Sequence, residues 1–79
     1  MGLLTDKEVM RMLSAGVLFG RCHHVLSQFE AETVYEAGKR FVEFKREAQI
    51  TDAEWLVIDE ATDAMRKEVA RLAALDEAA

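Results

Sequence analysis

Residues 9–29 read VMRMLSAGVLFGRCHHVLSQF, and this stretch decides the fold that the sequence predicts. Its apolar residues recur alternately three and four positions apart, which is the spacing of one face of an α-helix. A second apolar set lies on another face of the first half, so this helix must be covered on two sides. The first set is Met12, Ala15, Phe19, Cys22, Leu26 and Phe29, and the second is Val9, Met10, Leu13 and Val17.

Two glycines, Gly16 and Gly20, lie four positions apart in the same helix. Each costs about 1 kcal/mol in a helix interior, but together they let the backbone of another helix approach closely. A helix with two apolar faces lies between other helices or at a subunit interface. We therefore expect a homodimer whose interface contains Met10, Leu13, Gly16, Val17 and Gly20.

The length of 79 residues predicts a single domain, residues 1–79. A chain this short buries only roughly 60–65% of its unfolded surface, so its core is marginal without an added staple. The single cysteine excludes an internal disulfide, and the cysteine–histidine spacing of a structural zinc site is missing. Self-association remains as the added source of stability, and the share of hydrophobic residues, 51%, also favours it.

The net charge of the chain and its expected cellular location narrow the classes of partner that it could bind. No run is long and apolar enough to span a bilayer, and the N-terminus lacks the basic region of a signal peptide. With the lone thiol, this favours a cytoplasmic protein. The net charge of −5 argues against direct nucleic-acid binding. The basic residues Lys39, Arg40, Lys45 and Arg46 are interleaved with Glu36, Glu43 and Glu47, as in solvated pairs such as Glu36–Arg40, although a basic patch for an acidic partner stays open.

Capping boxes mark where helices begin, because a Ser or Thr side chain and a Glu three positions later satisfy each other's backbone amides. Two such boxes, Thr5 with Glu8 and Thr51 with Glu54, each follow an apolar residue and fix two helix starts. The start of the middle helix has two rival candidates. These are Thr33 with Glu36, which we place first, and Ser27 with Glu30.

The sequence thus predicts an all-α fold, a small three-helix domain with helices at about 5–29, 33–48 and 51–75. No proline and no β-type alternation interrupts this pattern. Tyr35 and Val42 are expected to flank and widen the apolar stripe of the middle helix. The apolar surface around these two residues is the alternative binding surface if the acidic residues of the last helix bind nothing. The stripes are Val34, Ala37, Phe41, Phe44 and Ala48 in the middle helix, and Trp55, Ile58, Thr62, Met65, Val69 and Leu72 in the last.

Cys22, His23 and His24 form the only cluster of residue types that bind metals or act as nucleophiles. Consecutive helical residues point about 100° apart, so the three cannot converge on one ion from a single helix. We expect Cys22 in the core, the histidines at its boundary, and neither a metal nor a cofactor. A site assembled between subunits is the alternative.

The last helix carries an acidic strip of Asp52, Asp59, Glu60 and Asp63. Carboxylates near a helix N-terminus are favoured by the helix dipole, so a solvated face is the plain interpretation. The alternative is an anionic face that binds a basic partner, since no lysine or arginine enters the strip before Arg66. No nucleophile, phosphate-binding loop or pocket signature accompanies these carboxylates, so we expect no enzyme.

The stretch Ile50-Thr51-Asp52-Ala53-Glu54-Trp55-Leu56-Val57-Ile58-Asp59-Glu60 resembles a helix opening of small phage-encoded type I anti-CRISPR proteins. That resemblance implies a non-enzymatic, cofactor-free inhibitor that binds a host complex. Separately, complexes that handle nucleic acid expose basic surfaces, and the acidic face of the last helix would complement such a surface. The alternative is a self-assembling structural or small-ligand-binding helical protein, with the ligand between subunits near His23 and His24.

Overall fold

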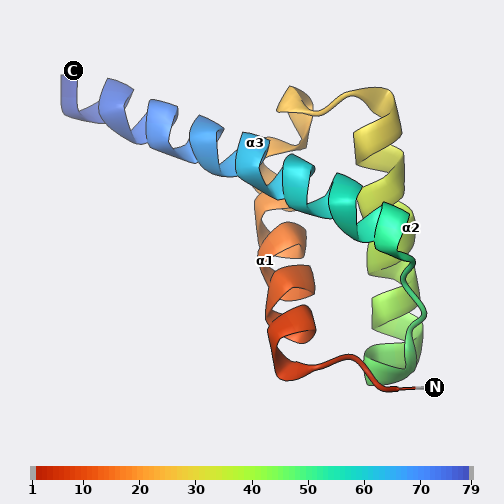
Figure 1. Ribbon diagram of the computed structural model, residues 1–79. Coiled ribbons are helices and arrows are strands. Elements are labelled where there is room, and N and C mark those ends of the chain that lie inside the picture. The colour runs from red at the N-terminus through yellow and green to blue at the C-terminus, as the bar shows by residue number, and fades with distance from the viewer. Residues whose placement is uncertain (1, 79) are drawn as a thin grey trace.

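The computed structural model describes residues 2–78 and is built from α-helices, with no strand in that range, so the predicted all-α class is confirmed. The chain order is α1 (Asp6–Cys22), the 3-10 turn η1 (His23–Val25), α2 (Gln28–Phe44), the 3-10 turn η2 (Lys45–Glu47) and α3 (Asp52–Ala78). Helices α1 and α2 form an antiparallel pair, and α3 lies across both (Figure 1). The C-terminal part of α3 extends beyond the pair, which gives the molecule its length of 50 Å. No helix among the described residues has the length and apolar content needed to cross a membrane.

Each helix begins at a complete capping box. Thr5 and Glu8 exchange hydrogen bonds of 3.1 and 2.9 Å between side chain and backbone amide, as predicted. Glu54 Oε1 accepts from the Thr51 amide at 2.9 Å, and the Glu54 amide donates to the Thr51 hydroxyl at 3.1 Å. These reciprocal bonds satisfy amides that the first helical turn leaves without partners. The two predicted helix starts are therefore confirmed.

The middle helix begins at the rival box, so the predicted start at 33 is wrong. Ser27 and Glu30 exchange the capping bonds, at 2.9 and 3.1 Å. The hydroxyl of Thr33 instead donates to the carbonyl of Phe29 one turn earlier, at 2.8 Å. A hydroxyl that bonds back into its own helix cannot cap a new one. Thr33 is an interior residue of α2.

The other predicted boundaries shift accordingly. The first helix ends at Cys22 rather than near residue 29, because Leu26 is extended (φ −88°, ψ 150°) ahead of the Ser27 cap. Phe29, predicted in the first core stripe, belongs to α2 and is 66% exposed. The middle helix ends at Phe44 rather than near residue 48, since Lys45 has a positive φ of 54°. The last helix, predicted to reach about residue 75, continues to Ala78.

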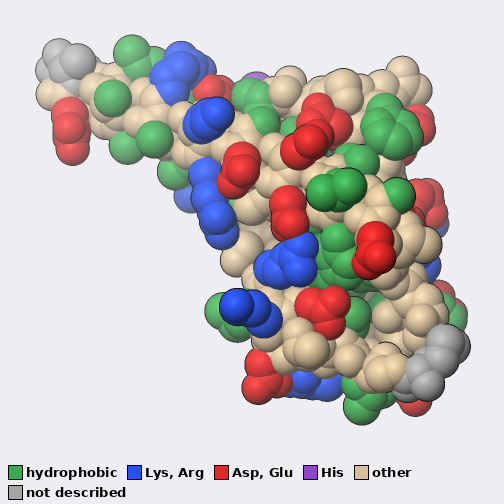
Figure 2. Space-filling model, viewed as in Figure 1, with side chains coloured by type: hydrophobic (Ala, Val, Ile, Leu, Met, Phe, Trp, Pro, Cys, Tyr) green, Lys and Arg blue, Asp and Glu red, His purple; other side chains and the backbone are tan. Residues whose placement is uncertain are grey.

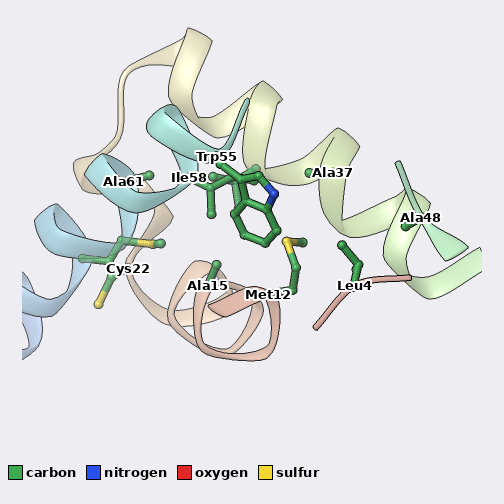
Figure 3. Close-up of a cluster of buried hydrophobic side chains, with 11 residues drawn as sticks. Leu4, Met12, Ala15, Cys22, Ala37, Ala48, Trp55, Ile58 and Ala61 are labelled. Carbon is green, nitrogen blue, oxygen red and sulfur yellow. The ribbon is translucent and has the colours of Figure 1, made fainter. Parts of the chain in front are cut away.

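The core lies where α3 crosses the α1–α2 pair, and the side chains of Trp55 and Met12 lie close together there (Figure 3). The buried threonine Thr62 donates its hydroxyl to the carbonyl of Ile58 at 2.7 Å, so its burial leaves no polar atom unpaired. Phe44 and Leu72, predicted on core stripes, are exposed because each lies near an end of its helix, beyond the crossing. The buried apolar residues are Leu4, Met12, Ala15, Cys22, Val34, Ala37, Ala48, Trp55, Ile58, Ala61 and Met65.

Candidate protein-docking groove

Two arginines show which sides of α1 and α2 face α3. Arg11 of α1 donates to the Asp59 carboxylate, with Nε 3.2 Å from Oδ1. Arg40 of α2 donates to the Glu54 carboxylate, with one guanidinium nitrogen 3.0 Å from Oε1. Both acceptors belong to α3, so each arginine marks the side of its helix that faces α3. Successive helical residues point about 100° apart, and the direction of a residue near either arginine follows from its distance in sequence.

A groove of about 660 Å³ runs between α1 and α2. Leu13 lies two positions after Arg11 and therefore points about 200° away from it around the helix. Val42 stands in the same relation to Arg40. The groove thus opens on the side opposite α3, and every lining residue comes from α1 or α2. The lining residues are Met12, Leu13, Gly16, Val17, Phe19, Val34, Tyr35, Gly38, Lys39, Phe41, Val42 and Glu43.

The walls of the groove are apolar and exposed. Val17 is 69% exposed, Val42 68% and Tyr35 55%, although all three are large apolar side chains. Lys39 and Glu43 are its only charged lining residues, and the Lys39 ammonium lies over the Tyr35 ring at 5.4 Å. An apolar concavity with a few polar groups at its edge is a common form of binding site.

Glycines keep the middle of the groove open. Apart from the adjoining residues and the nearby backbone of the same helix, no atom lies within 4 Å of the Cβ position that a side chain at Gly16 or Gly38 would occupy. The same holds for Gly20, so the described part of the chain makes no close backbone contact at the predicted glycine pair. The space above these glycines can admit the side chains of another helix.

The predicted dimer interface coincides in part with this groove. Leu13, Gly16 and Val17 line it, while Met10 and Gly20 are exposed on α1 outside the lining. The α2 wall includes Tyr35 and Val42, the alternative apolar binding surface predicted from the sequence, together with Gly38, which the sequence did not single out. Tyr35 and Val42, expected to flank the apolar stripe of the middle helix, are both exposed in the single chain.

The predicted acidic strip is divided by the packing of α1. Asp52, Glu60 and Asp63 are exposed, whereas Asp59 is half-buried against Arg11. The expectation that no cation enters the strip before Arg66 is therefore wrong at Asp59. Acidic and basic side chains intermingle over the face that α3 crosses (Figure 2). The role of Asp52, Asp59, Glu60 and Asp63 in partner binding stays a prediction.

Two carboxylates on α3 are held strongly in their charged form. Hydrogen bonds from Arg40 lower the pKa of Glu54 to about 2, with help from the Thr51 amide. Hydrogen bonds from Arg71 and then His24 lower the pKa of Glu68 to about 2. Arg40 pairs with Glu54 across the fold rather than with Glu36 on its own helix, contrary to the sequence prediction. Glu54 therefore ties α3 to α2, whereas Glu68 pairs with Arg71 within α3 and contacts His24 of η1.

The cysteine–histidine cluster diverges in the structure. Cys22 is 1% exposed in the core, as predicted. His23 Nδ1 lies 2.9 Å from the carbonyl of Phe19, and His24 Nε2 lies 2.9 Å from the Glu68 carboxylate. Among residues 2–78, no group of three or more His, Cys, Asp or Glu side chains could hold a metal ion. The groove is therefore the candidate functional site.

Comparison of the chain with protein-family models, with curated proteins and with solved structures finds no match.

Proposed function

We propose that this chain is a non-enzymatic protein-binding domain and that the groove between α1 and α2 is its docking surface. The observation that carries the proposal is the apolar lining of the groove on the side opposite α3. Contiguous apolar surface of this kind is rare on a protein with no partner. A groove between two helices receives the apolar face of an amphipathic helix, whose anchors recur at helical spacing.

The test replaces one exposed apolar residue on each wall with a charge, as Val17→Glu and Val42→Glu. The matched control is Leu56→Glu on α3, because Leu56 is 67% exposed and lies outside the groove lining. Association is measured in two ways: with a second copy by sedimentation, and with amphipathic helical peptides selected from a displayed library. We expect both groove variants to lose association and the control to keep it. Groove variants that associate as the unmodified chain does would refute the proposal.

The narrower setting that we propose is inhibition of a nucleic-acid-handling host complex in the cytoplasm, as by small phage-encoded type I anti-CRISPR proteins. The resemblance of residues 50–60 supports it, together with the exposure of Asp52, Glu60 and Asp63. Purified protein added to a type I CRISPR complex should then reduce binding of target DNA in a gel-shift assay. Undiminished DNA binding at saturating protein would remove this setting and leave the groove proposal intact.

The alternative, a self-assembling structural or ligand-binding helical protein, rests on the same groove. Native mass spectrometry separates the two functions, because a co-purifying small-molecule or metal mass on the assembled chain favours the alternative. Recovery of the single or doubled chain mass with no added ligand mass favours the protein-binding domain.

A further inference from the structure

We propose that the occupant of the groove is a second copy of this chain, so that two α1–α2 pairs pack face to face around a two-fold axis. This inference rests on the proposed function and names the partner of the same surface. It joins the residues predicted from α1 alone with the α2 wall into one self-complementary interface. The resulting dimer has four packed helices at its centre and one α3 on each outer side.

The face is large enough for a specific contact between two copies. Helices α1 and α2 have 17 residues each, which corresponds to about 25 Å of length at 1.5 Å per residue. With axes about 8–10 Å apart and each helix about 10 Å wide, the pair presents a face about 20 Å across, which is roughly 500 Å² per subunit and about 1,000 Å² in total. This total reaches the lower bound for a specific interface, and standard stable interfaces bury about 1,200–2,000 Å².

The lining combines large and small residues in a way that an identical face can match. Val17, Tyr35 and Val42 project from the walls, while Gly16 and Gly38 leave open space between them. A two-fold axis places the same surface on both subunits, so each projecting side chain can meet a small residue of the other copy. Helices that pack in this way place the ridges of one surface into the grooves of the other.

Charge favours a second copy over a charged partner. The chain carries a net charge of −5, which opposes self-association through most of its surface. The groove is an exception, because its charged lining residues are one lysine, Lys39, and one glutamate, Glu43. The exposed carboxylates Asp52, Glu60 and Asp63 belong to α3, on the other side of the α1–α2 pair. A locally neutral apolar face neither repels its own copy nor attracts a strongly basic or acidic peptide.

Sedimentation equilibrium on the full chain tests the inference. We expect the unmodified chain and Leu56→Glu to sediment at twice the chain mass of 8.9 kDa at micromolar concentration. Val17→Glu and Val42→Glu should sediment at the single-chain mass, with the helical circular dichroism unchanged. A milder pair, Val17→Asn and Val42→Asn, should raise the dissociation constant about tenfold or more, since each change occurs twice across a two-fold interface. This milder pair serves if either charged variant fails to fold.

The outcomes separate this inference from the proposed function. A folded unmodified chain that stays at the single-chain mass up to submillimolar concentration overturns the second copy as occupant. If a selected helical peptide then binds the unmodified chain and not Val17→Glu, the docking function stands with another helical partner. If no peptide binds either, both proposals fall. A dimer that tolerates both the charged and the milder groove variants has its interface elsewhere, and this overturns the second copy as occupant of the groove.

Discussion

At the scale of single residues, Trp55 and Arg11 join two helices at one point. The Trp55 ring is 7% exposed, and the Arg11 guanidinium lies over it at 4.1 Å. The same guanidinium is hydrogen-bonded to Asp59 one turn further along α3. Packing, a cation–π contact and an ion pair therefore fix α1 against α3 with few side chains.

Truncation of this aromatic residue should remove most of the stability of the domain. Trp55→Ala is expected to cost about 3–5 kcal/mol, the range for a large buried aromatic, against a total of about 5–15 kcal/mol for a typical small protein. Urea unfolding followed by circular dichroism measures the loss. Leu56→Ala is the control, because an exposed side chain should change stability by less than about 0.5 kcal/mol. Equal midpoints for both variants would contradict the core described here.

The two carboxylates with a lowered pKa predict a loss of stability in acid. Glu54 and Glu68 have a pKa of about 2 in the folded chain, against an ordinary value of 4.5. A pKa depressed by folding stabilises the fold above about pH 4.5, and this contribution disappears as pH falls towards 2. The urea midpoint should therefore fall across that window.

Glu54→Gln tests which carboxylate is responsible. The neutral amide cannot form the ion pair with Arg40, so the variant should be less stable than the unmodified chain at neutral pH. Its midpoint should also fall less steeply between pH 4.5 and 2. Glu60→Gln, at an exposed position of the same helix, is the control and should follow the unmodified chain. Parallel acid profiles for Glu54→Gln and the unmodified chain would contradict the assignment.

At the scale of the elements, the helix starts could be predicted only where one capping box stood alone. Ser27 with Glu30 and Thr33 with Glu36 both fit the local pattern. Contacts between residues far apart in the sequence decide which of the two boxes begins the helix, and local patterns do not contain those contacts. Leu26 packs on the core and His24 contacts Glu68 of α3, and both hold the chain out of helical geometry before Ser27. The apolar spacing continued in phase to Phe29 and so gave no signal of the break.

The choice of cap gives a direct test of the boundary. Ser27→Ala removes the acceptor for the Glu30 amide and should cost about 1 kcal/mol, the usual effect of losing an N-cap. Thr33→Ala removes a hydroxyl bonded within the helix and should change stability by less than about 0.5 kcal/mol. Thermal or urea unfolding of the two variants distinguishes them. A larger loss for Thr33→Ala would place the helix start where the sequence first suggested.

At the scale of the whole molecule, the apolar residues of each wall could be predicted separately, but their meeting in one groove could not. Leu13 and Val17 could be recognised as apolar residues outside the core stripe, because they lie off the first apolar stripe of their helix. Tyr35 and Val42 adjoin the stripe of α2, and their exposure depends on which side of α2 meets α3. The side of α2 that meets α3 carries the buried residues Val34 and Ala37 together with Arg40, which pairs with Glu54 of α3. A pairing across the fold leaves no periodic trace in either helix.

The acidic strip gives the last prediction, because its members now differ in their surroundings. Glu60 and Asp63 are exposed, so Glu60→Lys with Asp63→Lys should leave the melting temperature nearly unchanged. Asp59→Lys should lower it, since a second cation would face Arg11. If the strip binds a basic host complex, the double variant should also slow association, more at low salt than at high salt. Surface plasmon resonance with the type I CRISPR complex measures that rate.

The control for that experiment carries the same change of net charge at another place. Glu32→Lys with Glu36→Lys alters two exposed positions on α2, outside the strip and outside the groove lining. If the strip itself attracts the partner, this control should slow association less than Glu60→Lys with Asp63→Lys does. The reason is that complementary charge acts over about a Debye length, roughly 8–10 Å. An equal effect of the two double variants would assign the attraction to net charge. Association indifferent to both would leave the apolar groove as the only proposed surface for recognition.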